Sequence, residues 1–327
     1  MKKNILVGVM IAVFSIILAS CAPEPVEVIK EVEVVKEVEV EVIKEVEVEV
    51  EKEIGPLRKV RFTHGGSLCN LALFTSFEHS ELYAAEGLSP ESVVSPSISE
   101  QIAAINAGIV DFTSAPYTSS LATISQSDGT VVIVSGLGVG GLGLVAQEGL
   151  DTPEELMGTK WGLSPSDTLE VLGYKYLAKN GMSYDDIEVI YGGGGYNTVA
   201  AWKGGGLDVT NCVEPVCSDL VDTFGGERLS DGTDIFGEGY SDCVLMTSTG
   251  LIENEPEVVE GVLKALMVSQ QFVEQNQDAA IDITFGKWYK VAERSLVELA
   301  LGSVYPQIDQ RNQIDFIMNG VAFMKEL

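Results

Sequence analysis

Residues Leu82 to Pro116 read LYAAEGLSPESVVSPSISEQIAAINAGIVDFTSAP, which places a helix end, a strand, a helix and another strand in direct succession. Gly87 and Gly108 each stand where a helical pattern stops, a position that favours glycine. The strands expected at 92–95 and 110–114 flank a helix expected at 99–107. This order predicts neighbouring parallel strands in a sheet that helices cover on both faces.

The same alternation continues on both sides of this stretch. Further strands are expected at 59–63, 131–135, 142–146, 160–163, 187–191, 207–211 and 244–247. The intervening helices are expected at 71–86, 119–125, 166–180 and 197–203, and from Pro256 onward the pattern is nearly all helical. The sequence therefore predicts two doubly wound α/β lobes followed by a helical return.

Three stretches carry a resemblance to a known family. They are Leu82 to Pro116, then LDTPEELMGTKWGLSPSDTLEVLGYKYLAKNGMSYDDIEVI at 150–190, then TVAAWKGGGLDVTNCVEPV at 198–216. In this order, over roughly 60–282, they resemble substrate-binding proteins of ABC importers, in the branch that serves nitrate, alkanesulfonates such as taurine, and thiamine pyrimidine precursors. The tail beyond Trp288 lies outside the resemblance.

The resemblance implies a periplasmic binding protein-like fold of type II, in which a two-strand hinge joins the lobes and a small-molecule ligand lies in the cleft. The crossing strands are then expected at 142–148 and 242–249. Lobe one is expected at 56–146 and 243–327, and lobe two at 147–242. The implied partners are an ABC permease and its ATPase, with no catalysis and no cofactor.

The N-terminal region predicts a lipoprotein. Lys2 and Lys3 precede an apolar run from Ile5 to Leu18 of signal-peptide length, shorter than the roughly 20 residues of a membrane span. The run ends in Leu18-Ala19-Ser20-Cys21, which resembles a lipobox. We therefore expect a signal peptide at 1–20 and a lipid on Cys21, which would anchor the protein outside the cytoplasmic membrane.

Residues 21–55 are expected to form a spacer. From 24 to 54 the chain carries twelve Glu and four Lys among valines, with a single proline. Low complexity and like charges favour an extended tract. The heptad-like valines leave a coiled-coil stalk as the alternative.

Charge and cysteine content limit the partners of the body. The net charge is -29, with 49 acidic against 20 basic residues, so nucleic acid is not expected as a partner. Four cysteines follow the spacer, at 69, 212, 217 and 243, and their spacing does not match a common zinc site. Free thiols or one disulfide are expected, with the pairing left open and no metal.

Ligand residues are expected where strands lead into helices, because the cleft of a doubly wound sheet lies at the carboxyl ends of its strands. The loops selected are 67–70, 95–99, 114–119, 164–168, 192–197, 211–214 and 238–242. The candidate ligand-binding residues are Ser67, Asn70, Ser114, Tyr117, Thr118, Ser166, Asp167, Thr168, Tyr196, Asn197, Glu214 and Asp242. Ser, Thr and Asp also cap helices at such positions without any ligand.

The charge of these loops bears on the ligand. No Lys or Arg occurs from Phe62 through Thr159, and three candidate residues are acidic, at 167, 214 and 242. An anion would be repelled, so we expect a neutral or cationic ligand, such as an aminopyrimidine whose amine Glu214 holds. Further aromatic rings for stacking are available at Tyr191, Trp202 and Tyr240.

The sequence leaves two alternative functions open and contains one match to a dinucleotide-binding motif. The protein is not expected to be an enzyme, although a pyrimidine-synthesising branch resembles the family, and a ligand-sensing subunit of a membrane receptor is the other alternative. Residues 136–141 match G-x-G-x-x-G after a strand. Because the next stretch is extended and not helical, a dinucleotide site is not expected there.

Overall fold

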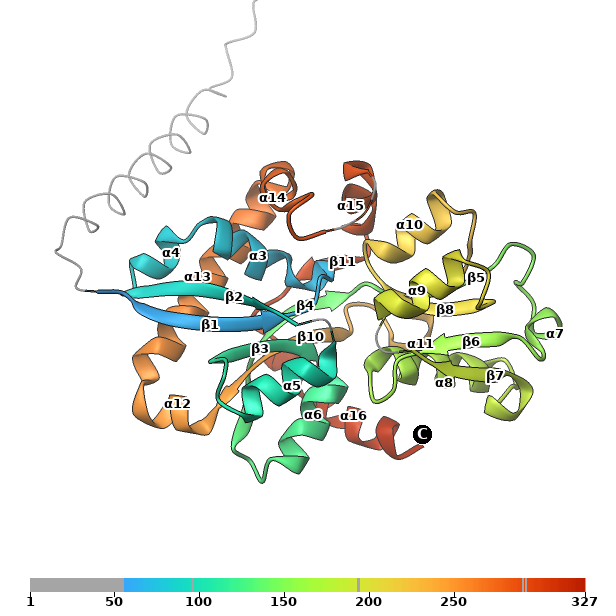
Figure 1. Ribbon diagram of the computed structural model, residues 1–327, viewed down its shortest axis with the longest axis horizontal. Coiled ribbons are helices and arrows are strands. Elements are labelled where there is room, and N and C mark those ends of the chain that lie inside the picture. Colours follow the sequence, from blue (N-terminus) through green and yellow to red (C-terminus); the bar gives the residue numbers. More distant parts are fainter. Residues whose placement is uncertain (1–55, 96, 193–194, 290, 292, 327) are drawn as a thin grey trace, which may run out of the picture. The chain divides into compact units, whose positions relative to one another are not determined.

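The computed structural model describes residues 56–326 apart from 96, 193–194, 290 and 292. Within that part the chain forms two α/β lobes, each built on its own sheet (Figure 1). The predicted fold class is confirmed. The expected signal peptide at 1–20, the lipid on Cys21 and the spacer at 21–55 lie outside the described residues.

The first lobe is built on a six-stranded sheet in the order β11-β4-β10-β3-β1-β2. Its strands are β1 (Arg58–His64), β2 (Leu88–Val94), β3 (Phe112–Pro116), β4 (Val131–Gly140), β10 (Ser241–Ser248) and β11 (Val304–Pro306). The first three run parallel, whereas β10 pairs antiparallel with both β3 and β4. Phe62 of β1 stacks on Phe112 of β3, with ring centroids 5.3 Å apart, inside the apolar core.

Helices cover both faces of this sheet, with α3 and α13 on one side and α5 and α6 on the other (Figure 1). The helices that follow first-lobe strands are η1 (Leu68–Asn70), α3 (Leu71–Glu78), α4 (Glu81–Ala84), α5 (Ile98–Asn106), α6 (Tyr117–Gln126), α12 (Thr249–Asn254), α13 (Pro256–Gln275), α14 (Gln277–Thr284), α15 (Arg294–Ala300), η3 (Arg311–Gln313) and α16 (Ile314–Glu326). The expected helix at 71–86 is thus divided into α3 and α4.

The second lobe has a five-stranded sheet in the order β7-β6-β8-β5-β9. Its strands are β5 (Leu142–Ala146), β6 (Lys160–Leu163), β7 (Glu188–Tyr191), β8 (Val209–Val213) and β9 (Glu227–Ser230). Its helices are α7 (Pro153–Leu156), α8 (Thr168–Lys179), η2 (Tyr184–Asp186), α9 (Gly195–Lys203), α10 (Val216–Asp222) and α11 (Thr233–Phe236). Trp161 and Leu163 of β6 are fully buried in its core.

The chain passes between the lobes at two glycine-containing segments. β4 ends in the first sheet at Gly140 and β5 lies wholly in the second sheet, while the return runs from α11 to β10. The expected crossing strands at 142–148 and 242–249 therefore each belong to one sheet, and the second lobe begins near 142, not 147. The reason is that Gly140 and Gly141 have φ of 73° and 83°, which lets the chain turn sharply between the two strands.

Two strands extend beyond the ranges expected from sequence. β2 begins at Leu88 and includes Pro90, which is tolerated because β2 is an edge strand and proline lacks only the hydrogen-bond donor. β4 continues through the glycine-rich stretch to Gly140, and β5 follows it without a helix. Strands β9 and β11 were not anticipated.

Two disulfides link the four cysteines of the described chain. Cys69 pairs with Cys243 in the first lobe, and Cys212 pairs with Cys217 in the second. The expectation of free thiols or a single disulfide is therefore wrong. Cys69 and Cys243 are 174 residues apart in sequence, and the folded sheet brings their Cα atoms to 6.0 Å. Cross-linking so distant residues lowers the entropy of the unfolded chain and stabilises the first lobe.

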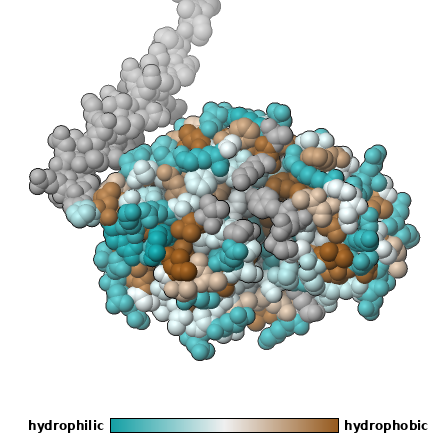
Figure 2. Space-filling view, viewed as in Figure 1, coloured by the Kyte–Doolittle hydropathy of each residue, from teal (hydrophilic) through white to brown (hydrophobic). Residues whose placement is uncertain are grey.

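On the face shown in Figure 2, hydrophilic residues predominate along the rim and hydrophobic residues form small separate groups. The strongly acidic composition of the chain accounts for much of this character. Across the described residues, no helix combines the length and the apolar character that spanning a bilayer requires.

The turn at Gly140 gives a prediction about stability. A Cβ added there would lie 2.2 Å from the carbonyl oxygen of Ser303, whereas one added at Gly149, with φ of 81°, would meet nothing within 4 Å. We expect Gly149→Ala to lower the free energy of unfolding by about 1 kcal/mol through backbone strain alone. Gly140→Ala should lower it by about 3 kcal/mol, because steric overlap adds to the strain.

Urea unfolding followed by tryptophan fluorescence measures both losses, and Gly149→Ala serves as the matched control. Equal losses in the two variants would show that the close approach of Ser303 to Gly140 does not constrain the crossing.

Candidate ligand-binding site

Among the described residues, loops that follow strands of the two sheets are hydrogen-bonded to each other across the lobes at three places. They are Leu68 N to the Glu214 carbonyl at 2.8 Å, Ser119 Oγ to the Ser166 carbonyl at 2.8 Å, and Thr118 Oγ1 with Thr168 Oγ1 at 3.1 Å. In each case one partner follows a strand of the first lobe and the other follows a strand of the second. The carboxyl ends of the two sheets therefore face each other at this junction.

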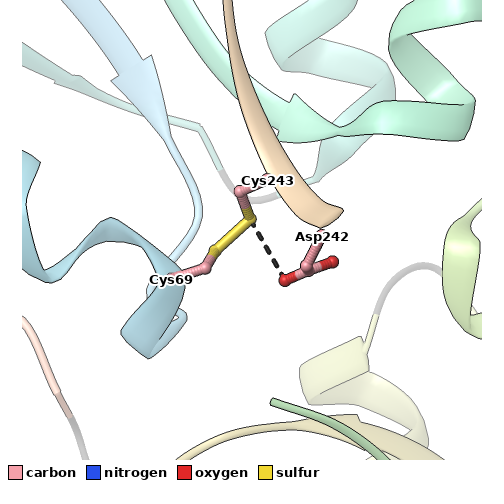
Figure 3. Close-up of side chains that lie close together, drawn as sticks. All are labelled: Cys69, Asp242 and Cys243. Carbon is pink, nitrogen blue, oxygen red and sulfur yellow. Dashed lines mark hydrogen bonds between the residues drawn. A yellow bond between two sulfur atoms is a disulfide. The ribbon is translucent and has the colours of Figure 1, made fainter. Parts of the chain in front are cut away.

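Asp242 is a buried carboxylate at this junction. It is the second residue of β10, and 2% of its surface is exposed. Its Oδ2 lies 3.3 Å from Cys243 Sγ (Figure 3). Because Cys243 is bonded to Cys69, that sulfur carries no proton to donate. Among the described residues, no hydrogen-bond donor therefore reaches the Asp242 carboxylate.

Asp167 approaches the same junction from the second lobe. It is the N-cap of α8, and its Oδ1 accepts a hydrogen bond from Leu169 N at 3.1 Å. Burial, only partly offset by this hydrogen bond, raises the pKa of Asp167 to about 6. Burial, followed by the nearby charge of Asp167, raises the pKa of Asp242 well above its ordinary value. The two carboxylates thus repel each other across the junction.

Several other buried side chains have polar atoms without a hydrogen-bond partner in the described structure, and three of them lie near the carboxyl ends of β3, β6 and β8. They are Tyr117 through Oη, Ser164 through Oγ, and Asn211 through both Nδ2 and Oδ1. Burial, and then the charge of Asp242, raises the pKa of Tyr117, so this phenol lies within electrostatic reach of that carboxylate. A buried polar group left unpaired costs about 1 to 3 kcal/mol. A ligand held at these strand ends would meet unpaired polar groups from both lobes.

The sequence had placed two of these residues in candidate loops without selecting them. Ser164 directly follows β6, and Asn211 lies within β8. The available signal was their position at the carboxyl end of a parallel strand. Only the folded structure distinguishes them from neighbours whose side chains already have partners.

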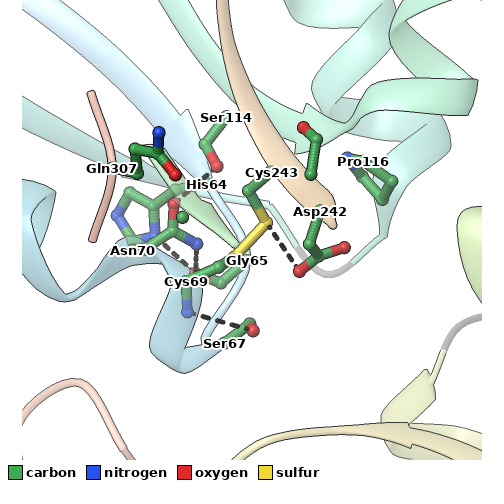
Figure 4. The surroundings of a disulfide bond; sticks show 12 residues. His64, Gly65, Ser67, Cys69, Asn70, Ser114, Pro116, Asp242, Cys243 and Gln307 are labelled. Atoms are coloured by element: carbon green, nitrogen blue, oxygen red, sulfur yellow. Dashed lines mark hydrogen bonds between the residues drawn. A yellow bond between two sulfur atoms is a disulfide. The ribbon is translucent and has the colours of Figure 1, made fainter. Parts of the chain in front are cut away.

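Several predicted ligand residues instead hold the first lobe together beside the disulfide (Figure 4). Ser67 accepts a hydrogen bond from Cys69 N at 3.4 Å. Ser114 donates to Asn70 Oδ1 at 2.5 Å, and Asn70 donates to the Gly65 carbonyl at 3.3 Å. Asp242 points away from this group, on the opposite side of the disulfide from Asn70. The predicted residues in this cluster have internal partners, which supports a structural role.

Thr118, Ser166 and Thr168, which were predicted to bind ligand, lie at the contact between the lobes, where the two threonines use their hydroxyls and Ser166 its backbone carbonyl. The side chains of Tyr196 and Asn197, also predicted, lie outside the described part of the structure.

Glu214 is buried at the junction, but it already has a charged partner. Arg228 from β9 forms a salt bridge to it at 2.9 Å, and Ser218 N donates to it at 3.0 Å. The expectation that Glu214 holds a ligand amine is therefore not supported. Arg228 lies on β9, a strand that the sequence pattern does not predict, so the sequence gives no sign that Arg228 neutralises Glu214.

The other aromatic candidates are engaged elsewhere. Trp202 is buried and donates through Nε1 to the Asp208 carbonyl at 3.2 Å. Tyr240 is buried and donates to the Asp231 carbonyl at 3.0 Å. Tyr191 is exposed, and its hydroxyl donates to Glu170 at 2.7 Å. Tyr117 alone of the described candidates combines a buried ring with an unpaired hydroxyl.

One cluster of potential metal ligands lies beside the disulfide of the first lobe. Within the described chain, Cys69, Asp242 and Cys243 form the one group of three potential ligands, with their ligand atoms within 4.8 Å of one another (Figure 3). Metal binding by cysteine requires a thiolate, and these two sulfurs are bonded to each other. In the oxidised protein the group offers a single carboxylate.

The C-terminal helix α16 contacts the first lobe next to the site. Phe316, Gly320 and Phe323 share one face of the helix by their spacing. The ring of Phe316 lies 5.3 Å from that of Tyr117. A Cβ added at Gly320 would lie 2.4 Å from the Tyr117 ring, so a residue without a side chain allows the helix to approach it.

The same face of α16 contacts the second lobe. Phe316 and Phe323 lie 6.0 and 6.3 Å from Phe236 of α11, measured between ring centroids. Lys175 Nζ of α8 lies 4.3 Å from the centroid of the Phe323 ring. The tail beyond Trp288, to which the sequence assigned no role, therefore joins Tyr117 of one lobe to two helices of the other (Figure 1).

The buried acids predict a pH dependence of stability. Asp167 has a pKa of about 6 in the folded protein against an ordinary 3.8, so between these values the folded state binds the extra proton. Its stabilising contribution is complete below about pH 4 and is lost as pH rises through 6, and amounts to about 3 kcal/mol in order of magnitude. The isosteric variant Asp167→Asn, which keeps a helix-capping side chain, should lose this dependence.

Thermal unfolding between pH 4.5 and 7.5 measures the effect, with the exposed Glu148→Gln as control. Burial lowers the pKa of His64, so this residue makes the protein more stable as pH rises. Its contribution is the same in wild type, Asp167→Asn and Glu148→Gln. The slope of Tm against pH should therefore be more positive in Asp167→Asn than in wild type or the control. Identical slopes would contradict the buried state of Asp167.

The contacts of α16 predict that it holds the lobes together. Phe323→Ala removes the ring that meets Phe236 and Lys175, a loss of about 1 kcal/mol, or roughly fivefold in the ratio of open to closed protein. Spin labels at the exposed positions Glu100→Cys and Glu188→Cys report the distance between the lobes. Without ligand, the distances should lengthen in Phe323→Ala.

The control for this measurement is Met318→Ala on the same helix, because Met318 is 58% exposed. It should leave the distances unchanged. If Phe323→Ala gives the wild-type distribution, α16 does not hold the lobes together.

The comparisons with known proteins agree with this architecture. The family model described as NMT1/THI5 like matches residues 77–280. A curated protein of Brucella abortus (strain 2308), which carries the provisional name of a binding protein, is 25% identical over 217 residues. The match covers 66% of this chain and 66% of that protein, so the chain spans about two thirds of the length of the relatives it matches.

Two solved structures share the fold. One is a ligand-binding component of an ABC-type import system from Staphylococcus aureus with zinc bound, with a TM-score of 0.70 and 16% identity over 83% of this chain and 93% of that one. The other is the alkanesulfonate-binding protein SsuA from Xanthomonas axonopodis pv. citri bound to MOPS, with a TM-score of 0.69 and 18% identity over 83% and 94%. At these identities the likeness concerns the fold. Since the family model covers more than half of the sequence, the chain belongs to the NMT1/THI5-like family.

Proposed function

We propose that this chain is the solute-binding component of an ABC import system and holds a small molecule between its two lobes, without catalysing a reaction. The observation that carries the proposal is the group of buried polar atoms without partners at the carboxyl ends of both sheets, with Asn211 contributing two of them. Such groups are costly unless a ligand satisfies them. Family membership and the names of the fold relatives are consistent with this role.

The proposal includes a place and partners. The Leu18 to Cys21 stretch supports export and lipid attachment at Cys21, with the binding lobes outside the cytoplasmic membrane. The partners would be a permease and its ATPase. Closure of two lobes on a ligand, with contacts from both sides, is the motion by which a protein of this architecture would capture its solute.

For the ligand we propose a neutral or cationic heterocycle, such as a pyrimidine precursor, in preference to a sulfonate or nitrate. Asp167 and Asp242 both face the junction, and the nearby Arg228 is already paired with Glu214. Asn211 has a free donor and a free acceptor on one amide, which suits the adjacent ring nitrogen and amino group of such a heterocycle.

A thermal-shift screen tests this function. The compounds are pyrimidines, other heterocycles, amines, sulfonates and nitrate, and a true ligand at 100 times its Kd adds about 2.7 kcal/mol of stability. Asn211→Ala should abolish the shift, whereas Asn254→Ala, at an exposed position, should retain it. A shift that Asn211→Ala retains, or no shift with any class of compound, would count against the proposed site.

A further inference from the structure

Asp242 is a buried acid that has no counter-charge among the described residues. The residue is 2% exposed, and the polar contact of its carboxylate among the described residues is with a disulfide sulfur. An ionised carboxylate in such a place requires a counter-charge or hydrogen-bond donors. In the described part of the chain, no Lys, Arg or His forms a salt bridge to Asp242 or Asp167.

The titratable groups near Asp242 come from the start of α8, the start of α6 and the segment that precedes β10. Asp167 faces it from the start of α8 and Tyr117 from the start of α6, and Tyr240 precedes it in the chain. Glu214, which also lies near Tyr240, is neutralised by Arg228. None of these groups supplies a positive charge to Asp242. The neighbour of Asp242, Cys243, pairs with Pro116, and the neighbours of Asp167, Ser166 and Thr168, are hydrogen-bonded to Ser119 and Thr118. Two buried acids from opposite lobes therefore lie near the start of α6, where Tyr117 is located.

We propose that the ligand carries a cationic nitrogen, as an ammonium or amidinium group, which binds between Asp242 of the first lobe and Asp167 of the second. This inference rests on the proposed function and narrows its ligand to one charge class. A positive group between the two carboxylates removes their mutual repulsion and supplies the donors that Asp242 lacks. The buried hydroxyl of Tyr117, which has no hydrogen-bond partner among the described residues, would supply a further hydrogen bond.

Binding at these two acids exchanges a bound proton for the cationic group of the ligand. In the empty protein a proton keeps at least one of the two carboxylates neutral, and the incoming cation takes the place of that proton. The O–H bond of the carboxyl breaks, its proton passes to water or buffer, and no other bond is made or broken. A sulfonate would meet two carboxylates and no cation, so the likeness of fold to an alkanesulfonate-binding protein does not extend to the charge of the ligand.

The test uses four aromatic probes of similar size and different charge, which are benzylamine, benzamidine, benzyl alcohol and benzenesulfonate. With the full chain near pH 6, the two cations should raise Tm, whereas the alcohol and the sulfonate should not. Calorimetry of the cations in two buffers of different ionisation enthalpy should show release of a proton on binding.

Asp242→Asn keeps the shape of the side chain and removes its charge. We expect it to weaken cation binding at least tenfold, to abolish proton release, and to raise the Tm of the empty protein, which would also show that the variant is folded. Asp167→Asn should weaken binding as well, and the exposed Glu148→Gln should not.

Each outcome has a defined meaning. Equal binding of benzylamine and benzyl alcohol, binding of benzenesulfonate, or unchanged cation binding by Asp242→Asn would overturn the cationic ligand while leaving the solute-binding function standing. If no probe binds and no compound of any charge binds in the wider screen, both proposals fail together.

Discussion

The structure depends on the return of the chain into the first sheet through β10. This strand is hydrogen-bonded to β3 on one side and to β4 on the other, so the first sheet is incomplete without it. The second lobe is thus an insertion between β4 and β10, and its two ends must lie close together. The same pairing brings Cys243 to Cys69 and sets Asp242 at the junction of the lobes.

This constraint explains why the site is formed by residues far apart in sequence. Asp242 belongs to the returning strand, Tyr117 to the helix after β3, and Asp167 to the first helix turn of the second lobe. No single loop holds more than a small part of the site. Because the two acids are buried without a cation, ionising both of them in the empty protein is electrostatically unfavourable.

The tail beyond Trp288 adds a second connection between the lobes. Gln310 is buried in the first lobe, where it donates to the Gly138 carbonyl at 3.1 Å and accepts from Ser241 Oγ at 2.7 Å. Gln313 donates to the Gly239 carbonyl at 3.1 Å, next to the second crossing. With its base tied to both crossing strands, α16 is held in place to lie against Tyr117 and Phe236.

The sequence by itself determined the two α/β lobes, because hydrophobic periodicity and glycine punctuation are local signals. Its candidate ligand residues include Tyr117 and Asp167, which follow strands of the two sheets, and Asp242, which begins the antiparallel strand β10. It also placed three acids at the junction. It assigned the ligand amine to Glu214, however, because nothing local links that residue to Arg228 in an unrecognised strand. The tertiary structure alone decided which acid lacks a counter-charge, which cysteines pair, and where α16 lies, because each depends on contacts between residues distant along the chain.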